Sequence, residues 1–232
     1  MKMIPPYLPL ILSLFSFAPL SGLSAQQTGT SPVKIFIMIG QSNMLGKGPV
    51  AGATTPGTLE YIVANDPGGD YQFLQDGSSN WVVRDDVWIR DQDPVAGGLT
   101  VGYGGEASGL IGPELGFGHL VGDLYEQQVL IVKCAWGGKS LGNDFLPPSS
   151  GPYPTPVADG DTGFYYQEVL RLVGEATANL ASYFPDYNAA GGYEIAGICW
   201  HQGYSDRVTP AFSDTYEVNL VNFKQREWPR SS

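Results

Sequence analysis

Three short runs of apolar residues constrain the fold of this chain more than any other feature of its sequence. They cover residues 34–39, 129–134 and 194–200, are rich in Ile and Val, and lack the polar alternation of a half-exposed strand. We therefore predict three fully buried strands. Segments with helical periodicity separate them, and strands that alternate with helices predict a parallel α/β sheet with right-handed crossovers.

Three segments have the spacing of amphipathic helices. The first begins at Pro113, because proline is favoured in the first turn of a helix, and the third begins at Ser213. The apolar faces are expected to be Phe117, Leu120, Val121 and Leu124 in the first helix, Tyr166, Val169, Leu170, Val173, Thr177 and Leu180 in the second, and Tyr216, Leu220 and Phe223 in the third.

Residues 49–108 interrupt this rhythm with a stretch rich in Gly, Asp and aromatic residues, in which residues 81–84 and 86–90 could pair as a hairpin or ribbon. Long insertions at the carboxyl end of a strand commonly shape a site. We interpret this one as a packed excursion near such a site, with an unpacked surface loop as the alternative.

The size and charge of the chain limit its possible partners. With 232 residues, of which 43% are hydrophobic, the chain suits one globular domain. The net charge of −11 argues against nucleic acid and anionic membranes, because both select a basic face. A neutral substrate such as a polysaccharide is compatible with this charge.

The N-terminus has the features of a secretory signal peptide. Lys2 is its only charge, an apolar stretch runs from Tyr7 to Leu20, and small residues follow as far as Ala25. A membrane anchor is the alternative, but prolines interrupt the stretch, and it is shorter than the ~20 residues of a span. We predict removal of residues 1–25, a secreted or periplasmic location, and no membrane association after cleavage.

The two cysteines, Cys134 and Cys199, lie near the ends of predicted buried strands. Export permits a disulfide, but buried free cysteines are common, and two unpaired thiols are the prediction. Neither cysteine has the C-x-x-C or Cys/His spacing of a metal site.

The first predicted strand ends in Gly-Gln-Ser-Asn-Met at residues 40–44. A serine at the tip of a strand that enters a helix exposes its hydroxyl at the carboxyl edge of the sheet, and its backbone N–H points the same way. Ser42 is therefore a candidate nucleophile, although a helix cap is the commoner role of such a serine. The glycine at position 40 is expected to permit a tight turn.

The other two predicted strands also end in polar or glycine-rich turns. Trp-Gly-Gly-Lys-Ser at residues 136–140 can bring backbone N–H groups close to a ligand, or can be a simple turn, and it lacks the glycine spacing of a phosphate loop. The amide of Gln202 can donate to an oxyanion. His201 is interpreted as a structural residue of its loop.

Four motifs occur in order: Gly-Gln-Ser-Asn-Met at 40–44, Gly-Pro-Glu-Leu at 112–115, Trp-Gly-Gly-Lys-Ser at 136–140 and Trp-His-Gln-Gly at 200–203. In this arrangement the chain resembles the sialate O-acetylesterase-like domain, which includes one group of acetylxylan esterases within the SGNH hydrolases. The resemblance runs from about residue 33 to 223. It implies a flavodoxin-like three-layer α/β/α sandwich with a parallel sheet, and neither a metal nor an organic cofactor.

The resemblance also implies the roles of the site residues. Ser42 is the nucleophile and first oxyanion donor, Gly137 or Gly138 is the second donor, with Gly138 the candidate we carry forward, and Gln202 is the third. The implied function is a serine esterase that removes O-acetyl groups from a carbohydrate, such as acetylated xylan or sialic acid.

Two positions depart from the pattern of the family. Many relatives have Glu where this chain has Tyr204, although Asp206 lies nearby. The base of the family is a histidine in a late Asp-x-x-His motif, and neither His119 nor His201 has an Asp three residues before it. We therefore expect the domain, residues 33–232, to be truncated at its C-terminus and to lack the catalytic histidine.

About two strands and a helix, on the order of 40–60 residues, are expected to be missing. In the flavodoxin-like order the first strand lies between the other two, so the strand at 194–200 is expected to be an uncovered edge.

Two other functions stay under consideration. A catalytically inactive carbohydrate-binding or structural relative is favoured by the missing histidine and disfavoured by the retained Ser42 and Gln202. A flavodoxin-like nucleotide-binding or signalling domain is disfavoured by the predicted export, the acidic charge and the lack of a phosphate loop. The sequence specifies neither the acetylated sugar nor the oligomeric state.

Overall fold

The computed structural model describes residues 32–93, 96–105, 109–152, 157–225 and 228. The predicted signal peptide lies outside these residues. In the part of the chain that is described, no helix is both long enough and apolar enough to cross a membrane.

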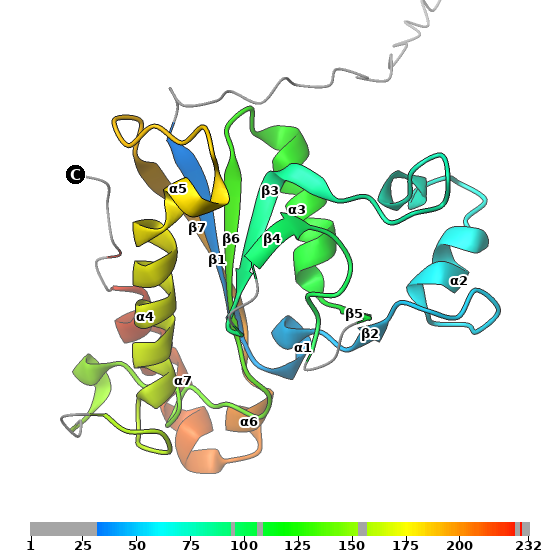
Figure 1. Ribbon diagram of the computed structural model, residues 1–232. Helices are drawn as coiled ribbons and strands as arrows, with labels where there is room; N and C mark the ends of the chain where they lie inside the picture. Colours follow the sequence, from blue (N-terminus) through cyan, green and yellow to red (C-terminus); the bar gives the residue numbers. More distant parts are fainter. Residues whose placement is uncertain (1–31, 94–95, 106–108, 153–156, 226–227, 229–232) are drawn as a thin grey trace, which may run out of the picture.

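A five-stranded sheet with the order β4-β3-β6-β1-β7 forms the centre of the molecule (Figure 1). The three predicted strands are β1 (Val33–Gly40), β6 (Val129–Ala135) and β7 (Tyr193–His201), and β1 runs parallel between the other two. β3 (Arg84–Asp91) lies parallel to β6 on its other side, and β4 (Ala96–Leu99) pairs antiparallel with β3. Among the described strands, β7 is the edge that the sequence predicts.

β3 and β4 correct the sequence-based expectation for this region. The predicted pairing of residues 81–84 with 86–90 is wrong, because Arg84–Asp91 is one continuous strand of the main sheet. Its side chains alternate between the two faces, so that Val87 and Ile89 are buried on one face while Trp88 packs on the other. The sheet therefore has two more strands than the sequence places, and both lie on the β6 side.

Helices cover both faces of the sheet and complete a three-layer α/β/α fold, as predicted (Figure 1). α1 (Ser42–Leu45) and α3 (Pro113–Leu124) pack on one face. α4 (Phe164–Ala178), α5 (Leu180–Tyr183) and α7 (Pro210–Lys224) pack on the other. α7 begins three residues earlier than expected.

The remaining elements are short. β2 (Gly48–Pro49) pairs antiparallel with β5 (Leu110–Ile111), and α6 (Tyr204–Arg207) follows β7. α2 (Leu59–Ala64) belongs to the insertion, which projects to the side of the sheet in Figure 1. The insertion is packed, because its residues Leu59, Val63 and Leu74 form a small apolar cluster with Leu115 of α3. Single 3₁₀ turns occur at Gln72–Leu74 and Pro148–Ser150.

Burial on both faces of the sheet explains the continuous apolar runs of β1 and β6. The prediction that the strand at residues 194–200 is fully buried is wrong, because β7 is an edge of the sheet and all of its residues are at least partly exposed. In β1, Ile35, Ile37 and Ile39 face α4 and α7, whereas Phe36 and Met38 face α1 and α3. The same alternation places Cys134 and Cys199 on opposite faces, and both are free thiols, as predicted.

The predicted apolar face of α3 is partly wrong. Leu120 and Leu124 are 59% and 69% exposed. Gly118 and Gly122 are buried instead, because their small size lets the helix lie close to the sheet: a Cβ on Gly118 would be 2.2 Å from a methyl carbon of Leu99. In α4 the predicted Val169 is buried, as is most of that face.

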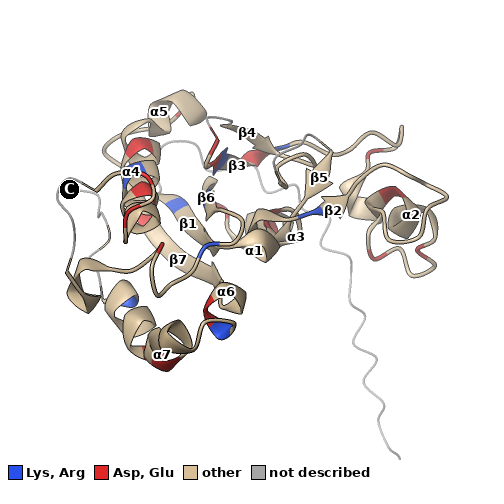
Figure 2. Cartoon of the chain, turned by 90° about the horizontal axis from the view of Figure 1, so that it is seen from below, with Lys and Arg blue, Asp and Glu red and all other residues tan. Residues whose placement is uncertain are grey.

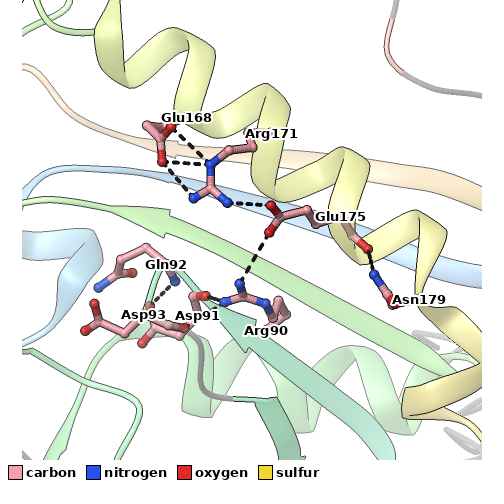
Figure 3. Close-up of polar contacts among 8 residues, drawn as sticks. All are labelled: Arg90, Asp91, Gln92, Asp93, Glu168, Arg171, Glu175 and Asn179. Carbon is pink, nitrogen blue, oxygen red and sulfur yellow. Dashed lines mark hydrogen bonds and ion pairs between the residues drawn. The ribbon is translucent and has the colours of Figure 1, made fainter. Parts of the chain in front are cut away.

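Charged side chains join α4 to the end of β3 (Figure 3). Arg171 donates to Glu168 and to Glu175 at 2.6–3.1 Å, and Glu175 also pairs with Arg90 at 3.7 Å. These groups are partly exposed, so each pair contributes little to stability. Their effect is to orient Arg90, whose guanidinium also donates to the backbone carbonyl of Asp93.

Candidate active site

The carboxyl ends of β1, β6 and β7 meet at one edge of the sheet, and the segments that follow them form the candidate site. These segments are residues 41–45, 136–144 and 202–207. Figure 2 looks onto this edge, where α1 and α6 lie beside one another. Parallel sheets usually bind their ligands outside this edge.

Ser42 is the first residue of α1 and is partly exposed. Its backbone N–H has no acceptor, and its hydroxyl has no hydrogen-bond partner among the residues that the structure describes. The preceding glycine is required by packing and not by a turn, because a Cβ on Gly40 would lie 2.2 Å from the carbonyl oxygen of His201. The carboxyl ends of β1 and β7 are therefore in close contact.

Gly137 and Gly138 form an exposed turn directly after β6. Gly138 has a φ of 73°, which favours glycine. Within the described residues, neither N–H has an acceptor. The turn is tied to β1 because the N–H of Trp136 donates to the carbonyl of Gly40 at 3.2 Å.

Gln202 links the other two segments. Its Nε2 lies 3.0 Å from the carbonyl oxygen of Lys139, which follows Gly138, and 3.3 Å from Oε1 of Gln41, which precedes Ser42. The three predicted site residues are therefore brought together at one edge. However, Nε2 also donates to Asp206 at 2.5 Å, and Oε1 of Gln202 is buried without a partner.

Gln41 and Asp206 are buried polar residues whose contacts the sequence did not reveal. Oε1 of Gln41 accepts the N–H groups of Gly203 and Ser205, each at 3.2 Å. Asp206, which is 1% exposed, accepts the N–H groups of two loop residues after β6 in addition to the amide of Gln202. The spacing of Gln202 and Asp206, four residues apart, gave no signal for this contact, because Gln202 lies before the N-cap of α6 and not in the helix.

A buried ion pair lies beneath the nucleophile segment. Nζ of Lys133, in the middle of β6, donates to Glu114 at 2.8 Å and to the carbonyl of Leu45 at 2.7 Å. It also donates to the carbonyl of Tyr103 at 2.5 Å. Both charged side chains are fully buried, and Glu114 accepts the N–H of Gly112 at 2.7 Å. Lys133 thereby fastens the end of α1 to the sheet and to the start of α3.

Asp91 adds a second carboxyl group near this ion pair. It pairs in register with Lys133 across β3 and β6 and is 6% exposed. Burial raises the pKa of Asp91 to about 6, although the charge of Lys133 opposes the shift. The ammonium group of Lys133 therefore lies near two buried carboxyl groups, and of these two it hydrogen bonds to Glu114 and not to Asp91.

Neither histidine contacts the hydroxyl of Ser42 in the described structure. His119 is buried on α3, where its ring packs edge-on against Phe73, and burial lowers its pKa. The side chain of His201 is exposed at the end of β7, while its backbone carbonyl accepts the N–H of Gln41 at 3.3 Å. Over the described residues, no group of three or more His, Cys, Asp or Glu side chains is placed to hold a metal ion.

Comparison with known proteins agrees with this arrangement of strand ends. The sequence model of a family described as carbohydrate esterase, sialic acid-specific acetylesterase, matches residues 32–226. The chain belongs to this family. Membership in the family confirms the resemblance and indicates, at a coarse level, an esterase that acts on acetylated carbohydrates.

The fold is also similar to a solved structure. An X-ray structure of a protein from Arabidopsis thaliana superposes with a TM-score of 0.50 at 18% sequence identity. The similarity covers 84% of this chain and 67% of the plant protein, and at this identity it supports the fold alone. A search of curated proteins gave no match.

Proposed function

We propose that this chain is a serine esterase that removes O-acetyl groups from a carbohydrate, with Ser42 as its nucleophile. The observation that carries the proposal is the joining of three strand ends around one amide. Gln202 contacts the neighbours of both Ser42 and Gly138, and the N–H groups of Ser42 and Gly138 are without acceptors in the described structure. The sugar-ester chemistry of the family supports the same reaction class.

In this mechanism the hydroxyl of Ser42 attacks the acetyl carbonyl carbon, and the negative charge moves to the carbonyl oxygen. The N–H groups of Ser42 and Gly138 then donate to this oxygen. Gln202 has two amide hydrogens, which its short contacts to Asp206 and to the carbonyl of Lys139 use, so it becomes the third donor by giving up the 3.0 Å contact to Lys139. The sugar leaves as an alcohol, and water hydrolyses the acetyl-serine.

A general base must accept the proton of Ser42 and pass it to the oxygen of the leaving sugar, and it must later accept the proton of the water and return it to Ser42. His201 lies at the correct edge of the sheet, but its exposed side chain makes no hydrogen bond to Ser42 in the described structure. We propose that His201 belongs to the framework of the site through its backbone carbonyl and that it is not the base.

The substrate proposed is an acetylated polysaccharide such as xylan, or an acetylated sialic acid. We further propose that the protein is exported, on the basis of the signal-peptide features of residues 1–25. Export would bring the enzyme to the extracellular space, where acetylated polysaccharides occur.

A second function is favoured by one observation. Because no described group is placed to deprotonate Ser42, the same edge could hold an acetylated sugar without cleaving it. In that case the unpaired N–H groups of Ser42 and Gly138 bind the acetyl carbonyl in its ground state.

Acetate release distinguishes the two functions. The purified protein and Ser42→Ala are incubated with p-nitrophenyl acetate, acetylated xylan and O-acetylated sialic acid. An esterase releases acetate from at least one sugar, and Ser42→Ala abolishes that release. Saturable binding of an acetylated sugar without release, equal in both proteins, supports the non-catalytic function.

A further inference from the structure

Asp206 is a buried carboxylate that joins the loop after β6 to the loop after β7. It accepts the N–H groups of Leu141 at 2.9 Å and Gly142 at 2.7 Å, and the amide of Gln202 at 2.5 Å. The first two donors follow the Gly138 turn by a few residues. One side chain therefore holds two of the three segments that carry the proposed oxyanion donors.

The three donors that converge on Asp206 require a carboxylate. Two backbone N–H groups and one amide N–H share its two oxygens, and a carboxylate has acceptor sites for all of them. Asparagine has one acceptor oxygen, and its NH₂ group would face a donor. Replacement by asparagine must therefore break at least one of the three hydrogen bonds.

Asp206 also determines which way the amide of Gln202 points. Every described partner of this amide is an acceptor on the Nε2 side, and the shortest contact is the charged one to Asp206. Turning the amide over would place Oε1 against the carboxylate. The present orientation is kept although it leaves Oε1 buried and unpaired, which has a cost of its own.

We propose that Asp206 is a positioning residue for ester hydrolysis, which acts by holding the NH₂ group of Gln202 toward the edge where the acetyl oxyanion forms. The inference rests on the proposed function, because it assigns Asp206 a role in the same site. Asp206 itself does not touch the substrate. Its carboxylate fixes the donor that does.

Hydrogen exchange measured by NMR tests the positioning directly. The side-chain NH₂ signals of Gln202 are assigned by their loss in Gln202→Ala and are followed in wild type, Asp206→Asn, Asp206→Ala and Asp144→Asn. Asp144 is the matched control, because it accepts two hydrogen bonds from Ser140 in the same loop and does not contact Gln202. Asp206→Asn should speed exchange at Gln202, and Asp144→Asn should not. Unchanged protection of Gln202 in both Asp206→Asn and Asp206→Ala, which has no acceptor at this position, overturns the proposal.

Kinetics of Ser42 acetylation by p-nitrophenyl acetate test whether Asp206 acts through Gln202. Asp206→Asn should slow acetylation about tenfold or more, within the ~10²–10³-fold loss typical of an oxyanion donor, and should leave KM unchanged. The slowing should be smaller when Gln202→Ala is already present. Equal slowing in both backgrounds contradicts the proposal. If the wild-type protein does not react with the ester, the proposed function fails, while the exchange experiment still decides the role of Asp206.

Discussion

Removal of the buried ammonium of Lys133 should destabilise the protein and disturb the nucleophile segment together. Lys133→Met keeps the length of the side chain and its apolar part, but it leaves the carboxylate of Glu114 fully buried without its cation. The carbonyls of Leu45 and Tyr103 also lose their donor. Breaking a buried ion pair in this way typically costs about 3–5 kcal/mol.

That cost is large beside the roughly 5–15 kcal/mol that stabilises a typical native protein. The loss in the free energy of unfolding is measured by urea unfolding followed by tryptophan fluorescence. The double variant Lys133→Met/Glu114→Gln has no unpaired charge at either of these two positions and should regain at least about 1 kcal/mol relative to Lys133→Met. If Lys133→Met unfolds within about 1 kcal/mol of wild type, the pair does not have the buried geometry described here.

Two further predictions follow from individual groups. Asp91→Asn should stabilise the protein at pH 7–8 and change little below about pH 4, because the folded-state pKa of about 6 lies above 3.8 in the unfolded chain. Between pH 3.8 and about 6 the folded state binds more protons than the unfolded state, so the contribution of Asp91 lowers the stability of the wild type by at most about 3 kcal/mol as the pH rises. Thermal melts across this pH range measure this loss of stability, which should be absent in Asp91→Asn. Gln202→Ala should slow ester hydrolysis by roughly 10²–10³-fold with an unchanged fold by circular dichroism, whereas an effect confined to KM would assign Gln202 to sugar binding.

The sequence revealed the three strands with continuous apolar runs, although β7 is partly exposed, and it missed β3 and β4, which are not uniformly apolar. Residues 34–39 form a continuous apolar run because both faces of β1 are covered by helices. β3 begins with Arg84 and ends with Asp91, and its buried residues Val87 and Ile89 alternate with others. β4 contains two glycines, which by composition indicate a turn. Only pairing with β6 and β3 makes these segments strands.

The positions of the site residues followed from chain direction, whereas their contacts did not. Parallel strands bring their carboxyl ends to one edge, so Ser42, Gly138 and Gln202 were expected together. Lys133 gave no signal, because a lysine within an apolar run has no visible partner until α3 and α1 are in place. Asp206 could be noticed as a polar residue close to Gln202 in the sequence, but its two bonds to the loop after β6 depend on long-range packing.

Trapping of an acetyl group on Ser42 tests the central claim most directly. The protein is incubated with p-nitrophenyl acetate, quenched with acid and digested, and the peptide that contains Ser42 is analysed by mass spectrometry. We predict an acetyl group on Ser42 that is absent in Ser42→Ala and is formed more slowly in Gln202→Ala. Acetyl groups found only on lysine side chains, at the same rate in wild type and Ser42→Ala, would contradict the assignment of Ser42 as the nucleophile.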